Sequence, residues 1–109
     1  MPHLIVEHTR DIDEISQLLQ DLHHNLGQQD TVNIESLKTR SICLDHVVIG
    51  NGDMQSMVHV TLRLLPGRDD MLLKKMTTDL DSIARQHCSS LNTRITVESV
   101  ELYKPSYKN

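Results

Sequence analysis

The stretch MVHVTLRLLPGR (57–68) decides the fold that this sequence predicts. Apolar and polar residues alternate in it, as in a strand with one buried face, and the apolar positions are Val58, Val60, Leu62 and Leu64. The pattern predicts a strand over 55–65. Pro66 and Gly67 then break the strand, because proline and glycine favour turns.

The residues after this stretch complete a β-α-β unit. Apolar residues recur at helical spacing from Asp70 to Ser90 and predict an amphipathic helix there. A further strand is expected over 94–102, with a bulge near Ser99 because its apolar phase slips. No element is expected in the tail, 103–109, which we predict to be loosely held.

The first half of the chain has the same order of elements. A branched, apolar run predicts a strand over 2–8. A helix is expected to start at Asp11, with Glu14 completing a capping box, and to end at Gly27. Another strand is expected over 38–49, after a polar crossover.

Together the two units predict one α+β domain over 1–109. The units, 2–49 and 55–103, resemble each other faintly, which favours a pseudo-symmetric, two-layer domain with a four-stranded mixed sheet and both helices on one face. Strands joined through a helix should run parallel. The other face of the sheet needs a cover, and a partner subunit is the expected one.

Composition excludes several classes of protein. The 109 residues carry 15 acidic and 11 basic side chains, a net charge of -4, which argues against nucleic-acid binding. No apolar run approaches the roughly 20 residues of a membrane span, and the N-terminus does not resemble a secretory signal. The two cysteines, Cys43 and Cys88, are too few for a disulfide framework and are expected to be buried. The cytoplasm is the expected location.

Pro2 is the most informative residue for function. Initiator methionine is generally removed before a small residue such as proline, and removal would leave a secondary amine at the start of a strand. Burial or neighbouring cations lower the pKa of an amine, and a neutral amine can act as a general base. On its own, however, a proline at this position is more often a simple strand start.

The neighbouring motifs strengthen the functional interpretation. The N-terminal MPHLIVE (1–7), the repeated β-α-β order and VHVTLRLLPGR (58–68) together resemble the tautomerase superfamily, and within it the 5-carboxymethyl-2-hydroxymuconate isomerases. The resemblance implies a trimer and a processed Pro2 as catalytic base. It also implies an isomerase that shifts a double bond in an unsaturated keto or enol dicarboxylic acid, in the catabolism of aromatic compounds. Neither a metal nor an organic cofactor is implied.

Three cations are candidates for binding such a substrate, because arginine binds carboxylates bidentately. Arg68 corresponds to the family's arginine after the third strand. Arg40 and Lys38 lie in a segment that resembles the family's two-arginine segment, with lysine in place of one arginine. Which of these two faces the substrate is left open.

Two alternatives to isomerisation remain. The same scaffold and proline serve decarboxylation, hydration or dehalogenation of unsaturated acids within the superfamily. A trimeric binding module without catalysis is the other alternative. The chain has no Phe or Trp, so the apolar wall beside the proline must be aliphatic, and Ile5, Val6 or Met57 are candidates.

The seven histidines do not predict a metal site, because no pair of them has suitable ligand spacing with a carboxylate nearby. We expect packing or solvated roles for them, with a structural hydrogen bond for His59, and the role of His3 is left open.

Overall fold

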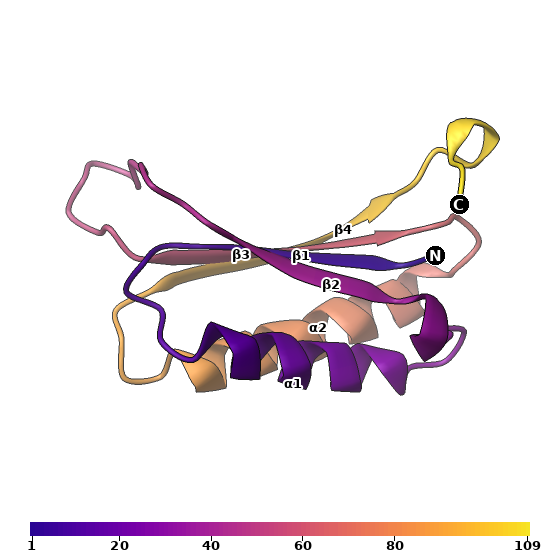
Figure 1. The fold of residues 1–109 in the computed structure, drawn as a ribbon, viewed down its shortest axis with the longest axis horizontal. Coiled ribbons are helices and arrows are strands. Elements are labelled where there is room, and N and C mark those ends of the chain that lie inside the picture. The colour runs from indigo at the N-terminus through magenta and orange to yellow at the C-terminus, as the bar shows by residue number, and fades with distance from the viewer.

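The computed structural model describes residues 1–109 and contains four strands and two α-helices (Figure 1). In chain order the elements are β1 (His3–His8), α1 (Ile15–Gly27), β2 (Lys38–Cys43), β3 (Met57–Leu64), α2 (Asp70–His87) and β4 (Arg94–Glu101), with short 3-10 turns at Ile34–Ser36 and Lys104–Ser106. The order of strands in the sheet is β2-β1-β3-β4. Pairing is parallel within each β-α-β unit and antiparallel between β1 and β3.

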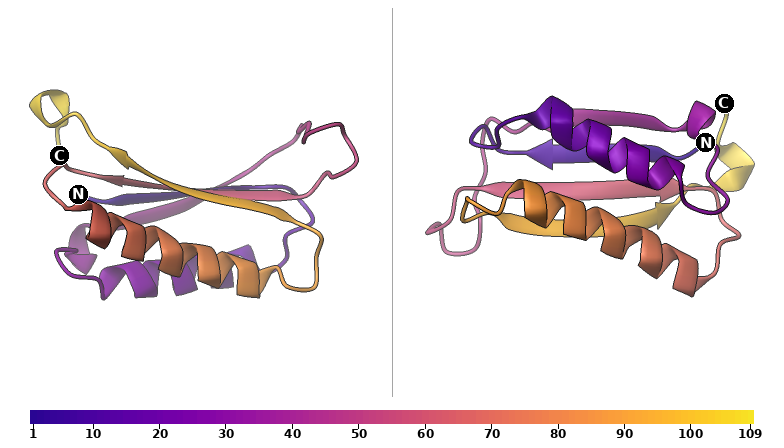
Figure 2. Two further views of the ribbon diagram at one scale, coloured as in Figure 1. Left: turned by 180° about the vertical axis from the view of Figure 1, so that it is seen from behind. Right: turned by 90° about the horizontal axis from the view of Figure 1, so that it is seen from below.

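Both helices cover the same face of the sheet (Figures 1 and 2). The predicted fold class, a two-layer α+β domain with a mixed four-stranded sheet, is therefore confirmed. Alternate residues of β1 and β3 point toward the helices and are buried. Ten large side chains are fully or almost fully buried in this layer: Leu4, Leu18, Leu22, Leu26, Leu62, Met76, Leu80, Val6, Val58 and Val60. Each such side chain contributes about 1.5–3 kcal/mol of transfer free energy.

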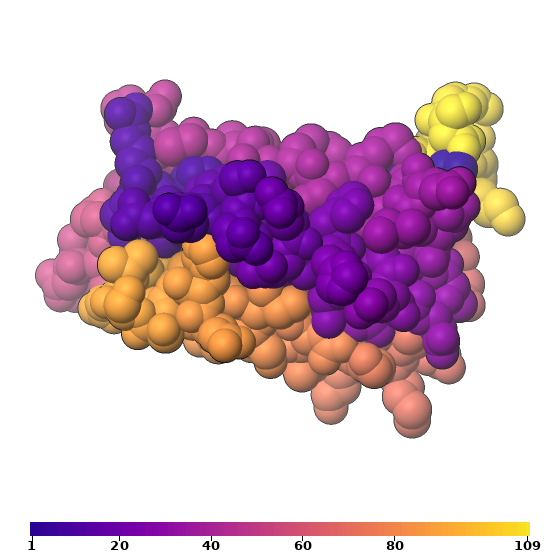
Figure 3. Space-filling view, turned by 60° about the horizontal axis from the view of Figure 1, so that its bottom comes forward, coloured from indigo at the N-terminus to yellow at the C-terminus, as the bar shows by residue number.

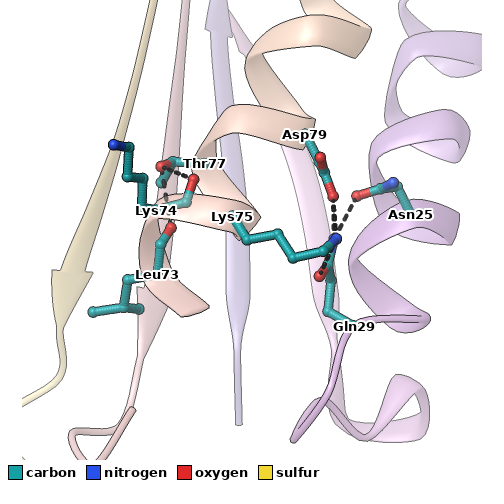
Figure 4. Close-up of polar contacts among 7 residues, drawn as sticks. All are labelled: Asn25, Gln29, Leu73, Lys74, Lys75, Thr77 and Asp79. Carbon is teal, nitrogen blue, oxygen red and sulfur yellow. Dashed lines mark hydrogen bonds and ion pairs between the residues drawn. The ribbon is translucent and has the colours of Figure 1, made fainter. Parts of the chain in front are cut away.

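The two helices also pack against each other, and Figure 3 shows them in contact along this side of the molecule. A polar cluster joins α1 to α2 near the end of α1 (Figure 4). The buried Gln29 amide donates to Asp79 at 2.8 Å and to Asn25 at 3.2 Å, and Lys75 donates to Asp79 at 2.8 Å. The cluster therefore fixes the loop that follows α1.

No element covers the other face of the sheet, which we call the open face (Figure 1). The alternation of β1 places His3, Ile5 and Glu7 on it, and the strand register adds Arg40 and Arg63. The predicted need for a cover on this face is consistent with its exposure in the single chain.

The start of α1 differs from the prediction. The helix begins at Ile15, and Glu14 precedes it in a left-handed conformation (φ 56°) without any side-chain cap. The Asp11 carboxylate instead accepts hydrogen bonds from the hydroxyls of Thr9 (2.6 Å) and Ser56 (2.5 Å). The expected capping box is therefore wrong, because Asp11 is engaged by a neighbouring segment that local sequence does not reveal.

The second strand is shorter than the predicted 38–49. It ends at Cys43, and residues 44–56 form an arm that rises on the open-face side (Figure 1). A single antiparallel bridge between Ile49 and Met54 closes the arm around the predicted glycine turn. Val48 in the arm is 87% exposed, so its apolar character does not reflect burial in this chain.

Two predictions about the C-terminal part are also wrong. The pairing of β3 with β4 runs without interruption from Met57–Arg94 to Leu64–Glu101, so there is no bulge at Ser99. The slip in apolar phase arises because Val97 and Val100 lie on opposite faces of one regular strand. The tail is not loosely held either, since the Tyr107 hydroxyl lies 2.7 Å from His3 Nε2.

Candidate active site

Pro2 lies at the start of β1, where the strand enters the sheet. Its side chain is buried, and its carbonyl accepts a hydrogen bond from the Lys38 N–H at 3.1 Å, which extends the ladder between β1 and β2. Proline fits this position because its missing N–H breaks no ladder bond at the first residue of a strand. A pocket of about 300 Å³ opens beside it, lined by Met1, Pro2, Thr31, Asn33, Ser36, Leu64, Leu65 and Arg68.

An amine at this end of the chain is in an environment that favours its neutral form. The Met1 α-amine donates to Ser36 Oγ at 2.7 Å. Its pKa lies below the ordinary value because of burial and because of the positive charges of Lys38 and Arg68. While Met1 is attached, the Pro2 nitrogen is an amide without basic character.

The side chain of Arg68 is held firmly at the pocket. Its Nε donates to Thr31 Oγ1 at 2.8 Å, and its terminal nitrogens donate to the carbonyls of Thr31 and Leu65, each at 3.1 Å. Thr31 has a positive φ of 71°, which is unfavourable for a β-branched residue. This strained turn places both oxygens of Thr31 toward the guanidinium.

The chain reaches Arg68 through a turn that requires glycine. Gly67 has φ 124°, a conformation that residues with a Cβ rarely adopt. Asp69 then caps α2 by accepting from the Leu72 N–H at 2.8 Å. Because Asp69 already occupies this helix start, the side chain of Arg68, and not the helix start, is the group at this turn that can attract an anion.

The pocket brings together only some of the predicted site residues. Pro2 and Arg68 line it, and Lys38 lies at its edge, where the Lys38 ammonium donates to the Ser36 carbonyl at 2.9 Å. Arg40 does not line it. The Arg40 guanidinium lies on the open face and donates to His3 Nδ1 at 3.1 Å.

The aliphatic wall beside Pro2 is formed by Leu64 and Leu65 rather than by Ile5, Val6 or Met57. Antiparallel pairing of β1 with β3 places the start of β1 beside the end of β3, so Met57 lies at the opposite end of the sheet. Val6 is buried under the helices, and Ile5 lies on the open face.

The sequence analysis did not identify three residues around Pro2 and His3: Thr31, Ser36 and Tyr107. The first two lie in the polar crossover, where no periodic pattern assigns positions. Tyr107 is one of only two aromatic residues in the chain, and this rarity was the one signal that could have drawn attention to it. Asn109 also reaches the N-terminus, with its amide 2.7 Å from the Met1 sulfur.

His59 and the two cysteines lie outside the lining of this pocket. His59 contacts Thr96 and Glu98, each at 2.6 Å, as expected for a structural hydrogen bond. No three His, Cys, Asp or Glu side chains gather into a metal-binding group. Cys88 is buried as predicted, and burial raises its thiol pKa, but Cys43 is exposed. Neither helix is long and apolar enough to cross a membrane.

A larger hollow of about 840 Å³ lies at the other end of the sheet, under the arm. The lining includes Arg10 and Asp45, which pair with each other and are both exposed. Because this pair neutralises its own charge, the hollow offers no free cation for an acidic substrate. The pocket at Pro2, although smaller, contains Arg68, which forms no ion pair.

Solved structures with a similar arrangement of strands and helices identify the class of this fold. A 5-carboxymethyl-2-hydroxymuconate isomerase from Deinococcus radiodurans R1 is similar, with a TM-score of 0.89 and 20% identity over 99% of this chain and 87% of that chain. A fused 4-OT symmetric trimer is similar over 92% of this chain and 86% of that chain, with a TM-score of 0.77 and 15% identity. The fold is thus that of the tautomerase superfamily.

The chain belongs to the 5-carboxymethyl-2-hydroxymuconate isomerase family, whose sequence profile matches residues 2–107. A second solved structure, a 5-carboxymethyl-2-hydroxymuconate delta-isomerase, has a TM-score of 0.85 and 15% identity over all of this chain and 87% of that one. No curated protein matches the sequence. Family and fold together support an isomerase-type function.

Proposed function

We propose that this protein is a cofactor-independent isomerase that moves a proton on an unsaturated keto or enol dicarboxylic acid, with Pro2 as general base. The observation that carries the proposal is the shared pocket of Pro2 and Arg68, in a chain of the 5-carboxymethyl-2-hydroxymuconate isomerase family. A base and a carboxylate-binding cation are the two groups that such a reaction needs.

In the proposed reaction the neutral Pro2 amine takes a proton from a carbon next to the conjugated system. The C–H electron pair enters that system and forms a dienolate, while the amine becomes charged. The ammonium then returns the proton to a different carbon, which moves the double bond and restores the neutral amine. Atoms and charge balance without any further reactant.

The charges around the pocket suit both steps. Arg68 presents a fixed guanidinium to a carboxylate, and Lys38, bound to the lining residue Ser36, adds a second positive charge at the edge. Cations that bind the acid also stabilise the negative charge of the dienolate as it forms. The same charges, with burial, favour a neutral amine, as the lowered pKa of the Met1 amine illustrates for the adjacent position.

The assembly is part of the proposal. Some tautomerase-fold neighbours are described as symmetric trimers, and the open face of this chain is large and uncovered. We propose a homotrimer in which neighbouring subunits cover much of that face. We also propose a single tautomerase-like domain over 1–109 built from the repeats 2–49 and 55–103. We also propose a role in the catabolism of aromatic compounds, in the cytoplasm.

The experiment that tests the proposal begins with intact-mass measurement, which shows whether Met1 has been removed. Protein with a free Pro2 is then mixed with an unsaturated keto dicarboxylate in D₂O, and deuterium exchange and double-bond shift are followed by NMR. Pro2→Ala keeps the strand start but replaces the secondary amine, and we expect it to lose about 10²–10⁴-fold in rate. An unchanged rate in Pro2→Ala would rule out this base.

Labelling with a small electrophilic keto acid, followed by peptide mapping, provides the matched check. Selective modification of residue 2 is expected when Met1 is absent. Protein that retains Met1 is the control, because its Pro2 nitrogen is an amide. Loss of carbon dioxide or of halide in place of a shifted double bond would favour the other reactions of this scaffold.

A further inference from the structure

The open face carries a group of cations directly beside the start of β1. In the strand register, His3 is flanked by Lys38 on β2 and by Arg63 on β3, and Arg40 lies two residues further along β2. Antiparallel partners such as His3 and Arg63 have Cβ atoms about 4.5–5.5 Å apart. We call Lys38, Arg40 and Arg63 the cationic row.

No carboxylate compensates the cationic row, although the chain has 15 acidic residues against 11 basic ones. None of its three members forms an ion pair. Glu98, two residues before the register partner of Arg63, is bound instead to His59 at 2.6 Å. Like charges on adjacent strands are destabilising, so an anion in solution would relieve the repulsion.

The tail places a hydroxyl group next to this row. Tyr107 Oη lies 2.7 Å from His3 Nε2, and Arg40 approaches His3 Nδ1 at 3.1 Å. A guanidinium can only donate, so Nδ1 accepts and the single proton of the neutral ring must be on Nε2. His3 therefore donates to Tyr107, and the Tyr107 O–H keeps its own proton available for another acceptor.

His3 is suited to this fixed role because it stays neutral. Burial, followed by the charges of Arg40, Lys38, the terminal amine and Arg63, holds the His3 pKa below its ordinary value. A neutral His3 keeps both hydrogen bonds as described.

We propose that Arg63 and the Tyr107 hydroxyl, positioned by His3, bind a second carboxylate of the substrate on the open face. A dicarboxylate would then span the start of β1, with one end at Arg68 and the other at Arg63. The inference rests on the proposed function and assigns the residues that select dicarboxylates over monocarboxylates. Because unpaired cations are costly to bury against a neighbouring subunit, this end of the open face stays accessible to solutes in the proposed trimer.

The test compares two saturated probes, adipate and hexanoate, which have the same carbon chain but two carboxylates and one. Binding is measured by calorimetry on the full-length protein. We expect adipate to bind about tenfold more tightly, the ratio for one charge-assisted contact. Arg63→Gln and Tyr107→Phe should each remove most of that ratio and leave hexanoate affinity nearly unchanged.

Arg94→Gln is the matched control for charge. Arg94 pairs with Met57 in the register, so it lies on the same face at the opposite end of the sheet, and its loss changes the net charge equally. We expect this variant to keep the preference for adipate. An equal effect of Arg63→Gln and Arg94→Gln, or no preference in the unmodified protein, would overturn the proposed subsite.

The role of His3 is tested by rescue. Gln can donate and accept as neutral His does, so His3→Gln should keep the preference that His3→Ala loses. Equal losses in the two variants would contradict the positioning role. The ratio of adipate to hexanoate affinity is also measured in Pro2→Ala. This ratio depends on the Arg63 and Tyr107 subsite and not on proton transfer, so it should persist in Pro2→Ala. The subsite and the catalytic base can therefore fail independently.

Discussion

Arg68 is fixed by its neighbours before any substrate arrives. Its guanidinium donates three hydrogen bonds to oxygens of Thr31 and Leu65, and Thr31 adopts a left-handed backbone conformation while accepting two of them. Such strain costs of the order of 1–3 kcal/mol and persists only where surrounding structure enforces it. Here the polar cluster of Gln29 and Asp79, directly before this turn, provides that support.

The positive charge of Arg68 has a testable effect on the chain's amine. Arg68 helps to lower the pKa of the terminal amine, because a nearby cation disfavours the protonated form. Arg68→Gln should therefore raise that pKa, so that a larger fraction of the amine is charged at neutral pH. NMR titration of the N-terminal residue measures the change. Arg94→Gln is the control, and an identical titration curve in Arg68→Gln would contradict the coupling.

At the scale of single residues, sequence predicted Pro2 and Arg68 as neighbours, through family resemblance rather than through any local rule. Their catalytic and binding roles, like those of Arg40 and Lys38, stay predictions. Sequence patterns did not identify Thr31, Ser36 and Tyr107 as site residues, because these residues lie in segments without a periodic pattern. Their positions depend on contacts between parts of the chain far apart in sequence, which composition and spacing do not encode.

At the scale of elements, the link between the helices depends on one carboxylate. Asp79 on α2 accepts from Gln29, which follows α1, and from Lys75 one turn earlier. Asp81, on the same helix and similarly exposed, accepts only from Arg85. The two residues therefore form a natural pair for comparison.

Asp79→Ala should lower the free energy of unfolding by about 1 kcal/mol more than Asp81→Ala, because it leaves the buried Gln29 amide without this acceptor. Both changes introduce alanine into the same helix, so the gain in helix propensity cancels. Chemical denaturation gives the two values. Equal destabilisation by both variants would show that the link to Gln29 contributes nothing.

The same carboxylate predicts a dependence on pH. Hydrogen bonds from Lys75 and Gln29 lower the Asp79 pKa below its ordinary value of 3.8. The stabilisation from ionised Asp79 is therefore complete above that value and is lost as pH falls through the lower, folded-state pKa. The difference in free energy of unfolding between the unmodified protein and Asp79→Ala should shrink only in this acidic range.

Elements with a strong hydrophobic period were predicted well, whereas the start of α1 and the end of β2 were not. β3 and α2 follow their apolar residues closely, because burial under one layer imposes the period. α1 begins four residues after the predicted Asp11, and β2 ends at Cys43, because a side-chain contact and the departure of the arm decide these boundaries. Neither event leaves a local signal in the sequence.

At the scale of the whole molecule, the two helices cover one face of the sheet, and no element of the chain covers the other. Only 21 of the 109 residues are buried, and the core lies between the sheet and the helices. Topology was predictable because two β-α-β units with right-handed crossovers leave few arrangements. The expectation that a partner subunit covers the open face came from the exposed sheet and from the family resemblance, because one chain's periodicity does not describe a neighbouring subunit.

The arm gives a way to test the proposed homotrimer. Val48 in the arm is 87% exposed, and we expect a neighbouring subunit to bury it. Val48→Glu should then shift the protein toward monomers, which light scattering during size-exclusion chromatography detects. Met71→Glu is the control, because Met71 is 82% exposed but lies on α2, away from the open face. A trimer unaffected by Val48→Glu would exclude the arm from the interface.

The two ends of the chain meet at the proposed site, as the contact between Asn109 and Met1 indicates. A purification tag on either end would therefore project from the mouth of the pocket, and an N-terminal tag would also leave residue 2 acylated. Protein that keeps an N-terminal tag would therefore give a false negative result in every assay of the Pro2 amine. An affinity handle inserted in the exposed turn 89–92 between α2 and β4, at the far end of the sheet, keeps both ends native.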